Sequence, residues 1–170
     1  MKKLFTTASI LVALIVCTAA SVSAQATASA TASATIVTPI SITKTVDMNF
    51  GNVAVTTTGG TVVLSPAGVR TTTGGVTLPA ANGTVTAATF TVTGEGAYTY
   101  AITLPSADLT ITSGSNTMIV NAFTSTPSAT GTLTAGTQTL SVGATLNVSA
   151  SQAAGTYVSA TPFDVTVNYN

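Results

Sequence analysis

Residues 98–104 read Tyr98-Thr99-Tyr100-Ala101-Ile102-Thr103-Leu104, and every second side chain in this stretch is aromatic or large and apolar. Because the side chains of a β-strand point alternately to opposite faces, this spacing places the large residues together on one face. Pro105 follows directly and lacks a backbone N–H, so we expect the strand to end there. The stretch therefore predicts a β-strand that is buried on one side.

The same alternation returns along the chain in short runs that are separated by turn residues. Thr and Val dominate, and no stretch after the first 24 residues shows apolar residues at helical spacing. The alternating runs are Phe90 with Val92, Leu109 with Ile111, Leu140 with Val142, and Ala144 with Leu146 and Val148. The turn signals are Gly59-Gly60, Pro66-Ala67-Gly68, Gly74-Gly75, Asn82-Gly83, Gly94-Glu95-Gly96, Ser113-Gly114-Ser115-Asn116 and Gly136. Among them, Asn82-Gly83 is the strongest hairpin signal.

Short strands joined by polar turns predict an all-β fold, and we expect an immunoglobulin-like antiparallel β-sandwich. Each predicted strand has one apolar face, and two sheets can bury these faces against each other while their Thr-rich faces point outward. We assign residues 36–170 to this single β-sandwich domain. Residues 25–35 form a low-complexity Ala/Ser/Thr extension ahead of it.

The first residues are typical of a secretory signal peptide. A cationic head over residues 1–3 is followed by an almost wholly apolar run up to Ala20 and by small residues up to Ala24. We therefore predict a signal peptide over residues 1–24 and a secreted protein, which passes through the periplasm to the cell surface or the medium. The residue ahead of Cys17 is a valine, whereas a lipoprotein anchor normally needs a small residue there. No transmembrane span is expected after cleavage.

Ionisable side chains are almost absent from the mature chain. Those that remain after the leader are Lys44, Arg70, Asp47, Glu95, Asp108 and Asp164. Nucleic-acid binding therefore has no electrostatic basis. The single cysteine, Cys17, lies in the leader, so disulfide bonds and thiolate metal sites are excluded as well.

The chain contains no histidine, which removes the commonest general base and metal ligand. Ser/His/Asp and Cys/His mechanisms are therefore impossible, and we predict that the protein is not an enzyme and has no catalytic, cofactor-binding or metal-binding residues. A glycosidase with paired carboxylates is the catalytic alternative, and its pairs would be Glu95 with Asp108 or Asp47 with Asp164. Asp47 could alternatively bind calcium together with loop carbonyls.

The tyrosines allow two interpretations. Tyr98, Tyr100 and Tyr157 could present faces for sugar stacking, or they could belong to the core. The alternation of the first two with Ile102 and Leu104 favours the core.

Residues 26–36 read Ala-Thr-Ala-Ser-Ala-Thr-Ala-Ser-Ala-Thr-Ile. This composition favours a disordered leader. The strict alternation also permits a detachable strand, which would add to an exposed sheet edge through backbone hydrogen bonds. An edge on the next molecule would give head-to-tail self-association and a fibre, whereas an edge on the same molecule would leave a monomer. The candidate strand-donor residues are Ala26, Ala28, Ala30, Ala32, Ala34 and Ile36.

The chain ends in a second alternating stretch, which runs from Pro162 to Asn170. This strand is either the last strand of the core or a sheet edge that is offered to an assembly partner. Its candidate edge-strand residues are Phe163, Val165, Val167 and Tyr169.

Several blocks of sequence resemble a known family. They are Ala34 to Lys44, Asp47 to Val53, Phe90 to Gly94, Leu140 to Leu146 and Ala154 to Tyr157. In these blocks the chain resembles the bacterial secreted family called domain of unknown function 4402, with a more distant likeness to spore-coat-U-type and alpha-fimbrial subunits. Chaperone–usher pilins also end in an alternating strand with a penultimate tyrosine, matched here by Tyr169, although the disulfide that many of them carry is absent.

The pilin resemblance implies a pilin-like fold whose N-terminal extension is donated to a neighbour. It also implies a periplasmic chaperone and an outer-membrane usher as partners. We therefore expect a secreted structural or adhesive surface protein, a fimbria-like filament subunit assembled by β-strand addition. The alternative is a monomeric carbohydrate- or matrix-binding module whose ligand contacts lie in the Gly-rich loops.

Overall fold

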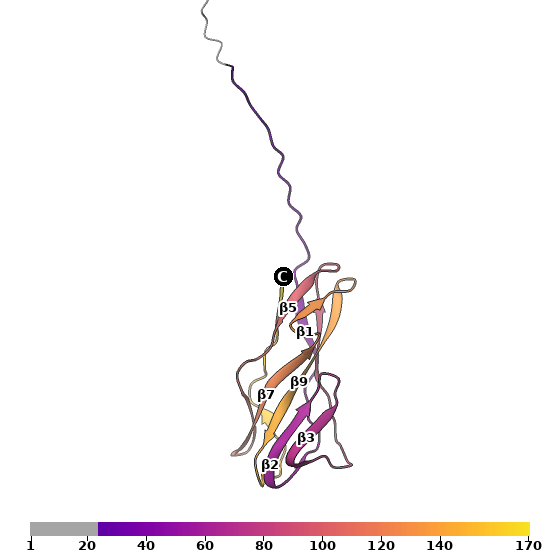
Figure 1. The fold of residues 1–170 in the computed structure, drawn as a ribbon, viewed down its shortest axis with the longest axis vertical. Helices are drawn as coiled ribbons and strands as arrows, with labels where there is room; N and C mark the ends of the chain where they lie inside the picture. Colours follow the sequence, from indigo (N-terminus) through magenta and orange to yellow (C-terminus); the bar gives the residue numbers. More distant parts are fainter. Residues whose placement is uncertain (1–23) are drawn as a thin grey trace, which may run out of the picture. The chain divides into compact units, whose positions relative to one another are not determined.

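The structure is a computed structural model that describes residues 24–170 (Figure 1). The predicted signal peptide, apart from Ala24, lies outside the described residues. From residue 36 onward the chain is built of β-strands, and no helix occurs in the described part, so the prediction of an all-β fold is confirmed. The strands are β1 (Ser41–Val46), β2 (Ala54–Leu64), β3 (Arg70–Thr77), β4 (Ala88–Thr93), β5 (Thr99–Thr103), β6 (Leu109–Ser113), β7 (Asn116–Thr126), β8 (Thr130–Thr132), β9 (Thr137–Val148), β10 (Val158–Ser159) and β11 (Thr166–Tyr169).

The strands pair antiparallel and form two sheets. The larger sheet has eight strands in the order β1-β4-β9-β7-β6-β10, and the β2–β3 pair joins it through β9. The smaller sheet has three strands in the order β11-β5-β8. The centre of the larger sheet is β9, which pairs with β4 along its first half, with β2 along its second half, and with β7 on its other side.

The larger sheet branches at Gly143. The pairing of β4 with β9 stops at Val142, and the pairing of β2 with β9 begins at Ala144, so β4 and β2 meet end to end beside Gly143. A Cβ atom on Gly143 would fall against the backbone carbonyl of Leu64. Glycine is therefore needed for this close approach, and the sheet divides here into a β1–β4 half and a β2–β3 half.

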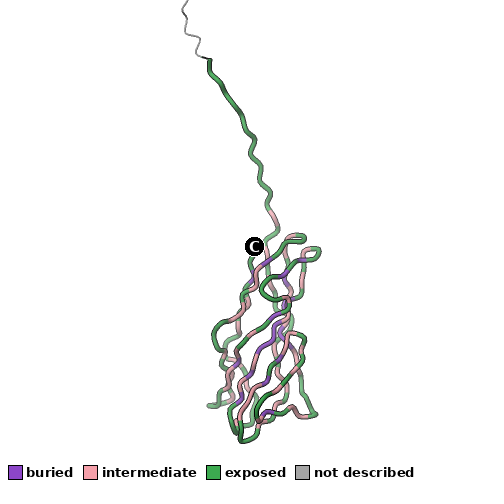
Figure 2. Tube along the Cα trace, viewed as in Figure 1, coloured by how far each residue is buried: buried purple, intermediate pink, exposed green. Residues whose placement is uncertain are grey.

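The core consists of two clusters of buried side chains (Figure 2). Residues from both sheets make up the first cluster, whereas those of the second come from the larger sheet alone. Side chains of β3 and β6, which lie far apart in the strand order, both pack into the second cluster, so the larger sheet is curled. The first cluster contains Ala88, Phe90, Val92, Tyr100, Leu133, Leu140, Val142 and Val167. The second contains Val62, Val76, Val120, Ala144, Leu146 and Val148.

The outer face of the larger sheet is lined by hydroxyl side chains. In β4, buried apolar residues alternate with threonines that face away from the core. Neighbouring strands repeat this pattern in register, and their hydroxyls are hydrogen-bonded between Ser41 and Thr93 at 2.7 Å and between Thr45 and Thr89 at 2.7 Å. The expected outward placement of the Thr-rich faces is confirmed, and it allows a nearly uncharged chain to be wetted.

The hairpin prediction at Asn82-Gly83 is wrong. The flanking strands β3 and β4 do not pair with each other. A tight two-residue hairpin instead lies between β6 and β7, where Ser113 pairs with Asn116 across Gly114-Ser115. Asn82 has a different role, since its carbonyl accepts a hydrogen bond from the Asn52 amide at 2.7 Å and thereby fixes the loop that leads to β4.

The prediction of turns is also wrong at Gly59-Gly60 and Gly74-Gly75. They lie inside β2 and β3, next to an irregularity in the register of that pair. Gly60 pairs with Gly74, which has a φ of 66°. A Cβ on either residue would fall against the backbone of the opposite strand. These glycines therefore permit a bulge and a close backbone approach, which the local sequence does not distinguish from a turn.

Candidate functional site

The N-terminal arm, which we define as residues 25–36, forms no strand. Each of its residues is exposed, including the six candidate strand-donor positions. Ile36, the last of these positions, is 97% exposed. Figure 2 shows the exposed run that precedes the domain. The alternating pattern of the arm is thus available to a binding partner.

The C-terminal stretch is placed in the core. Val167 is buried, and Phe163, Val165 and Tyr169 are half-buried against the first cluster. The Phe163 ring lies 5.0 Å from the Phe123 ring and 6.4 Å from the Phe90 ring, measured between centroids. Because β11 pairs only with β5 among the described strands, it is also the edge strand of the smaller sheet. The stretch is therefore a core strand that also lies at a sheet edge, and its use by an assembly partner stays a prediction.

Tyr169 links three segments that lie far apart in the sequence through the hydrogen bonds of its hydroxyl group. Its hydroxyl donates a hydrogen bond to the Thr38 carbonyl at 2.9 Å and accepts one from the Glu95 amide at 2.6 Å. The triangle is closed by the Thr38 amide, which donates to Oε2 of Glu95 at 2.9 Å. We call these three residues the terminal clasp. It fixes the chain just after Ile36 to the β4–β5 turn and to the last strand.

The terminal clasp accounts for the glycine at position 94 and for the carboxylate of Glu95 in the β4–β5 turn. A Cβ on Gly94 would fall against the Tyr169 hydroxyl, so the tyrosine fits only beside glycine. The hydrogen bond from the Thr38 amide favours the ionised carboxylate and lowers the pKa of Glu95. The sequence predicts a turn at Gly94-Glu95-Gly96, and nothing in the local sequence marks the partners of Glu95.

The edge strands differ in how well they are protected from pairing with a strand of another molecule. The edge strand β1 carries an exposed ion pair between Lys44 and Asp47 at 2.6 Å and lies beside β11. The three-residue strand β8 has its Thr132 amide bonded to Gln138 at 3.0 Å. The edge strand β3 is eight residues long and carries Arg70 as its only ionisable side chain. Since short strands discourage strand addition, the edge that offers the longest row of backbone groups in the described domain is β3, which the bulge at Gly74 interrupts.

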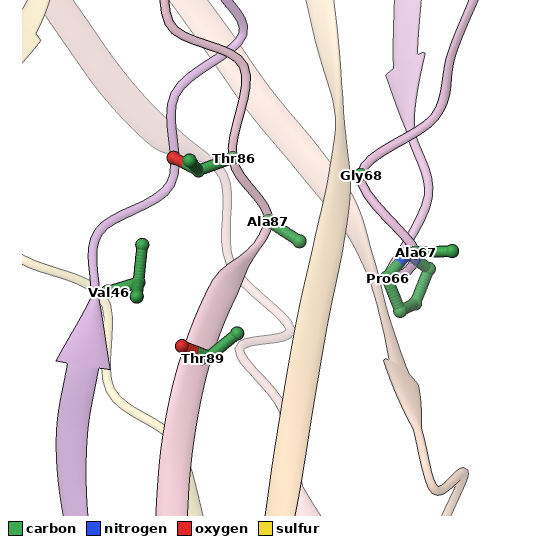
Figure 3. A pocket seen from close by; sticks show the side chains of 7 residues that line it. All are labelled: Val46, Pro66, Ala67, Gly68, Thr86, Ala87 and Thr89. Atoms are coloured by element: carbon green, nitrogen blue, oxygen red, sulfur yellow. The ribbon is translucent and has the colours of Figure 1, made fainter.

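A shallow hollow lies where the larger sheet branches, and we call it the branch hollow. Its volume is about 260 Å³. It opens between the end of β1, the start of β4 and the turn that joins β2 to β3 (Figure 3). Its lining is mostly apolar and carries no charged side chain. The lining residues are Val46, Pro66, Ala67, Gly68, Thr86, Ala87 and Thr89.

The family described as Domain of unknown function (DUF4402) matches residues 40–169. The chain belongs to this family. No curated protein matches the chain. No solved structure matches it either. The match of the family over residues 40–169 confirms the expected resemblance to DUF4402.

Three of the four acids of this DUF4402 domain have partners elsewhere in the domain. Asp47 is paired with Lys44, Glu95 belongs to the terminal clasp, and Asp108 accepts a hydrogen bond from Asn121 at 3.1 Å. Each of these three carboxylates thus has a separate partner. Within residues 24–170, no group of three or more acidic, histidine or cysteine side chains is arranged to hold a metal ion.

The tyrosines of the DUF4402 domain have different environments. Tyr100 is fully buried, and its hydroxyl donates to Oε1 of Gln138 at 2.7 Å. Burial raises the pKa of Tyr100. Tyr157 is half-buried and donates to the Ala153 carbonyl at 2.8 Å. Tyr98 is 47% exposed and packs edge-on against Tyr169. The core interpretation therefore holds fully for Tyr100 alone.

Residues 24–170 contain no helix that is long and apolar enough to cross a membrane.

Proposed function

We propose that this DUF4402 protein is a secreted structural subunit with an immunoglobulin-like, pilin-like β-sandwich, and that it self-associates head to tail by β-strand addition. The N-terminal arm of one molecule is the donor, and an open sheet edge of the next molecule is the acceptor. A periplasmic chaperone and an outer-membrane usher are the partners that this mode of assembly would employ. The observation that carries the proposal is the arm, which is wholly exposed although it has the alternation of a strand.

The composition of the arm supports this role. Small apolar residues and hydroxyl residues alternate, and no charge interrupts them. Strand addition gains its affinity from backbone hydrogen bonds, which such a sequence leaves unobstructed. The absence of charge also removes the repulsion that would keep neighbouring molecules apart.

The domain supports addition at an edge in preference to completion of an unfinished core. Its own C-terminal strand β11 pairs with β5, and Val167 fills the first cluster. In the described residues, no buried side-chain nitrogen or oxygen lacks a hydrogen-bond partner. The acceptor in this proposal is therefore a strand edge, and β3 is the longest edge strand of the described domain.

Sedimentation velocity and electron microscopy of the mature protein test the proposal. We expect concentration-dependent oligomers or filaments from residues 25–170, and monomers after deletion of residues 26–34. A matched control keeps the length of the arm but carries Ala28→Pro and Ala32→Pro, which remove two backbone donors and should also give monomers. A mature protein that stays monomeric at high concentration, or filaments that persist after the deletion, would contradict the proposal.

A further inference from the structure

Ile36 is an unusual residue for its position. It is the only large apolar side chain of the N-terminal arm, and it is 97% exposed. When a strand adds to an edge, its backbone gives affinity and pockets for particular side chains give specificity. The alanines of the arm can fit almost any surface, so Ile36 is the residue able to select a site.

The branch hollow has the chemistry to receive such a side chain. Val46, at its rim, is 40% exposed although it is apolar. The hydroxyls that line it are already bonded inside the domain, since Thr86 donates to the Asp47 carbonyl at 2.8 Å and Thr89 is bonded to Thr45 at 2.7 Å. The hollow therefore has apolar surface to bury, and its polar groups need no partner from a ligand.

The Ile36 of the same molecule does not occupy this hollow, because β1 separates the two. The strand β1 has six residues, and it runs from Ser41, on the side of Ile36, to Val46, at the hollow. At about 3.3 Å per residue, the two ends of β1 are about 17 Å apart. Figure 1 shows β1 and the C-terminus toward one end of the domain and the β2–β3 pair toward the other. If Ile36 is to fill the hollow, it has to be the Ile36 of a second copy.

We propose that Ile36 of one molecule is seated in the branch hollow of the next molecule. This inference rests on the proposed function, since the donated arm is what carries Ile36 to its neighbour. The contact joins two different surfaces, so each molecule keeps one free arm and one free hollow. Such a heterologous contact extends into a fibre unless a rotation closes it into a ring.

Substitutions on both sides of the contact test the proposal by sedimentation velocity. Ile36→Ser should weaken self-association by about 10- to 100-fold, because burial of one large aliphatic side chain is lost. Ile36→Leu keeps that burial and should associate much as the natural chain does. On the other side, Ala67→Trp fills the hollow from an exposed turn and should weaken association comparably. Val158→Ser removes an apolar side chain that is 61% exposed on β10, and it serves as the control that changes nothing.

Cysteine cross-linking places the contact directly, since the mature chain has no cysteine of its own. Chains with Ile36→Cys are mixed with larger, tagged chains that carry Ala67→Cys or, as the control, Val158→Cys. We expect an intermolecular disulfide between positions 36 and 67 and none between positions 36 and 158. A disulfide requires Cα atoms within about 7 Å, so this outcome would fix the register of the contact.

The possible outcomes separate the two proposals. If the mature protein associates, but Ile36→Ser associates equally well and position 36 does not cross-link to position 67, the hollow is not the site and strand addition still stands. If the mature protein never associates, the proposed function fails and this inference fails with it. Circular dichroism of each variant checks that the domain remains folded, which the exposure of Ile36 and Ala67 leads us to expect.

Discussion

The two ends of the mature chain have the same period-two pattern and different environments. The arm alternates alanines with hydroxyl residues, and all of it is exposed. The C-terminal stretch alternates Phe163, Val165, Val167 and Tyr169 with polar residues, and its large side chains pack into the first core cluster. Alternation thus predicts an extended chain in both places and does not predict where that chain packs.

The size of the alternating side chain accounts for the difference. Burial gains about 0.8 kcal/mol per CH₂ group, so a row of alanines gains too little to offset the entropy of ordering the backbone. Phenylalanine and valine gain several times as much per residue. The arm is therefore free to bind elsewhere, while the C-terminal stretch is committed to its own domain.

Deletion of residues 163–170 should have the largest effect. It removes β11 and the Phe163 and Val167 side chains, and loss of one core phenylalanine alone costs about 3–5 kcal/mol. We expect the free energy of unfolding, measured by urea denaturation, to fall by more than about 5 kcal/mol. Val167→Thr should cost about 1–3 kcal/mol by placing a hydroxyl in the core, whereas Asn168→Thr, on the exposed face of the same strand, should cost almost nothing. Equal effects at these two positions would show that β11 is not packed as described.

Tyr169→Phe should have an intermediate effect. It keeps the ring that packs against Tyr98 and removes the hydroxyl that bonds to the Thr38 carbonyl and the Glu95 amide. We expect a loss of about 1–2 kcal/mol, seen as a melting temperature lower by several degrees. Tyr98→Phe removes a hydroxyl that has no such role and is the matched control. A melting temperature unchanged by Tyr169→Phe would mean that the clasp contributes nothing to stability.

Glu95→Gln should have a smaller effect that depends on pH. The pKa of Glu95 is lower in the folded protein than its ordinary value of 4.5, because the Thr38 amide stabilises the carboxylate. The stabilising contribution is therefore fully present above pH 4.5 and is lost as the pH falls through the lower folded value. Melting curves of the natural and Glu95→Gln chains should differ slightly at neutral pH and converge in acid. A difference that stays constant with pH would exclude the carboxylate as its source.

The parts of the fold that follow from local alternation were predictable, and those that depend on distant partners were not. The strands around Tyr100 and Leu140 could be identified because large apolar residues and polar residues alternate along them, and this alternation is visible in the local sequence. The bulge at Gly60 and Gly74 could not be distinguished from turns, because its cause is the opposite strand. The branch at Gly143 and the hollow beside it likewise exist only once β4 and β2 have both paired with β9.

The candidate site divides in the same way. Alternation identified the arm and the C-terminal strand. The terminal clasp joins Thr38, Glu95 and Tyr169, which lie far apart in the sequence, and each of them is unremarkable in its own segment.

Deletion of the arm should have the smallest effect on stability. An unchanged stability would show that the arm does not pack on its own domain. Because every residue of the arm is exposed, removal of residues 26–34 should change the free energy of unfolding of the dilute monomer by less than about 0.5 kcal/mol. The same deletion should abolish self-association, so one change separates the two properties. A clear loss of stability in the monomer would mean that the arm pairs with an edge of its own domain. The alanine row would then behave like the C-terminal strand despite its small side chains, and backbone hydrogen bonds, not side-chain size, would decide where an alternating segment packs.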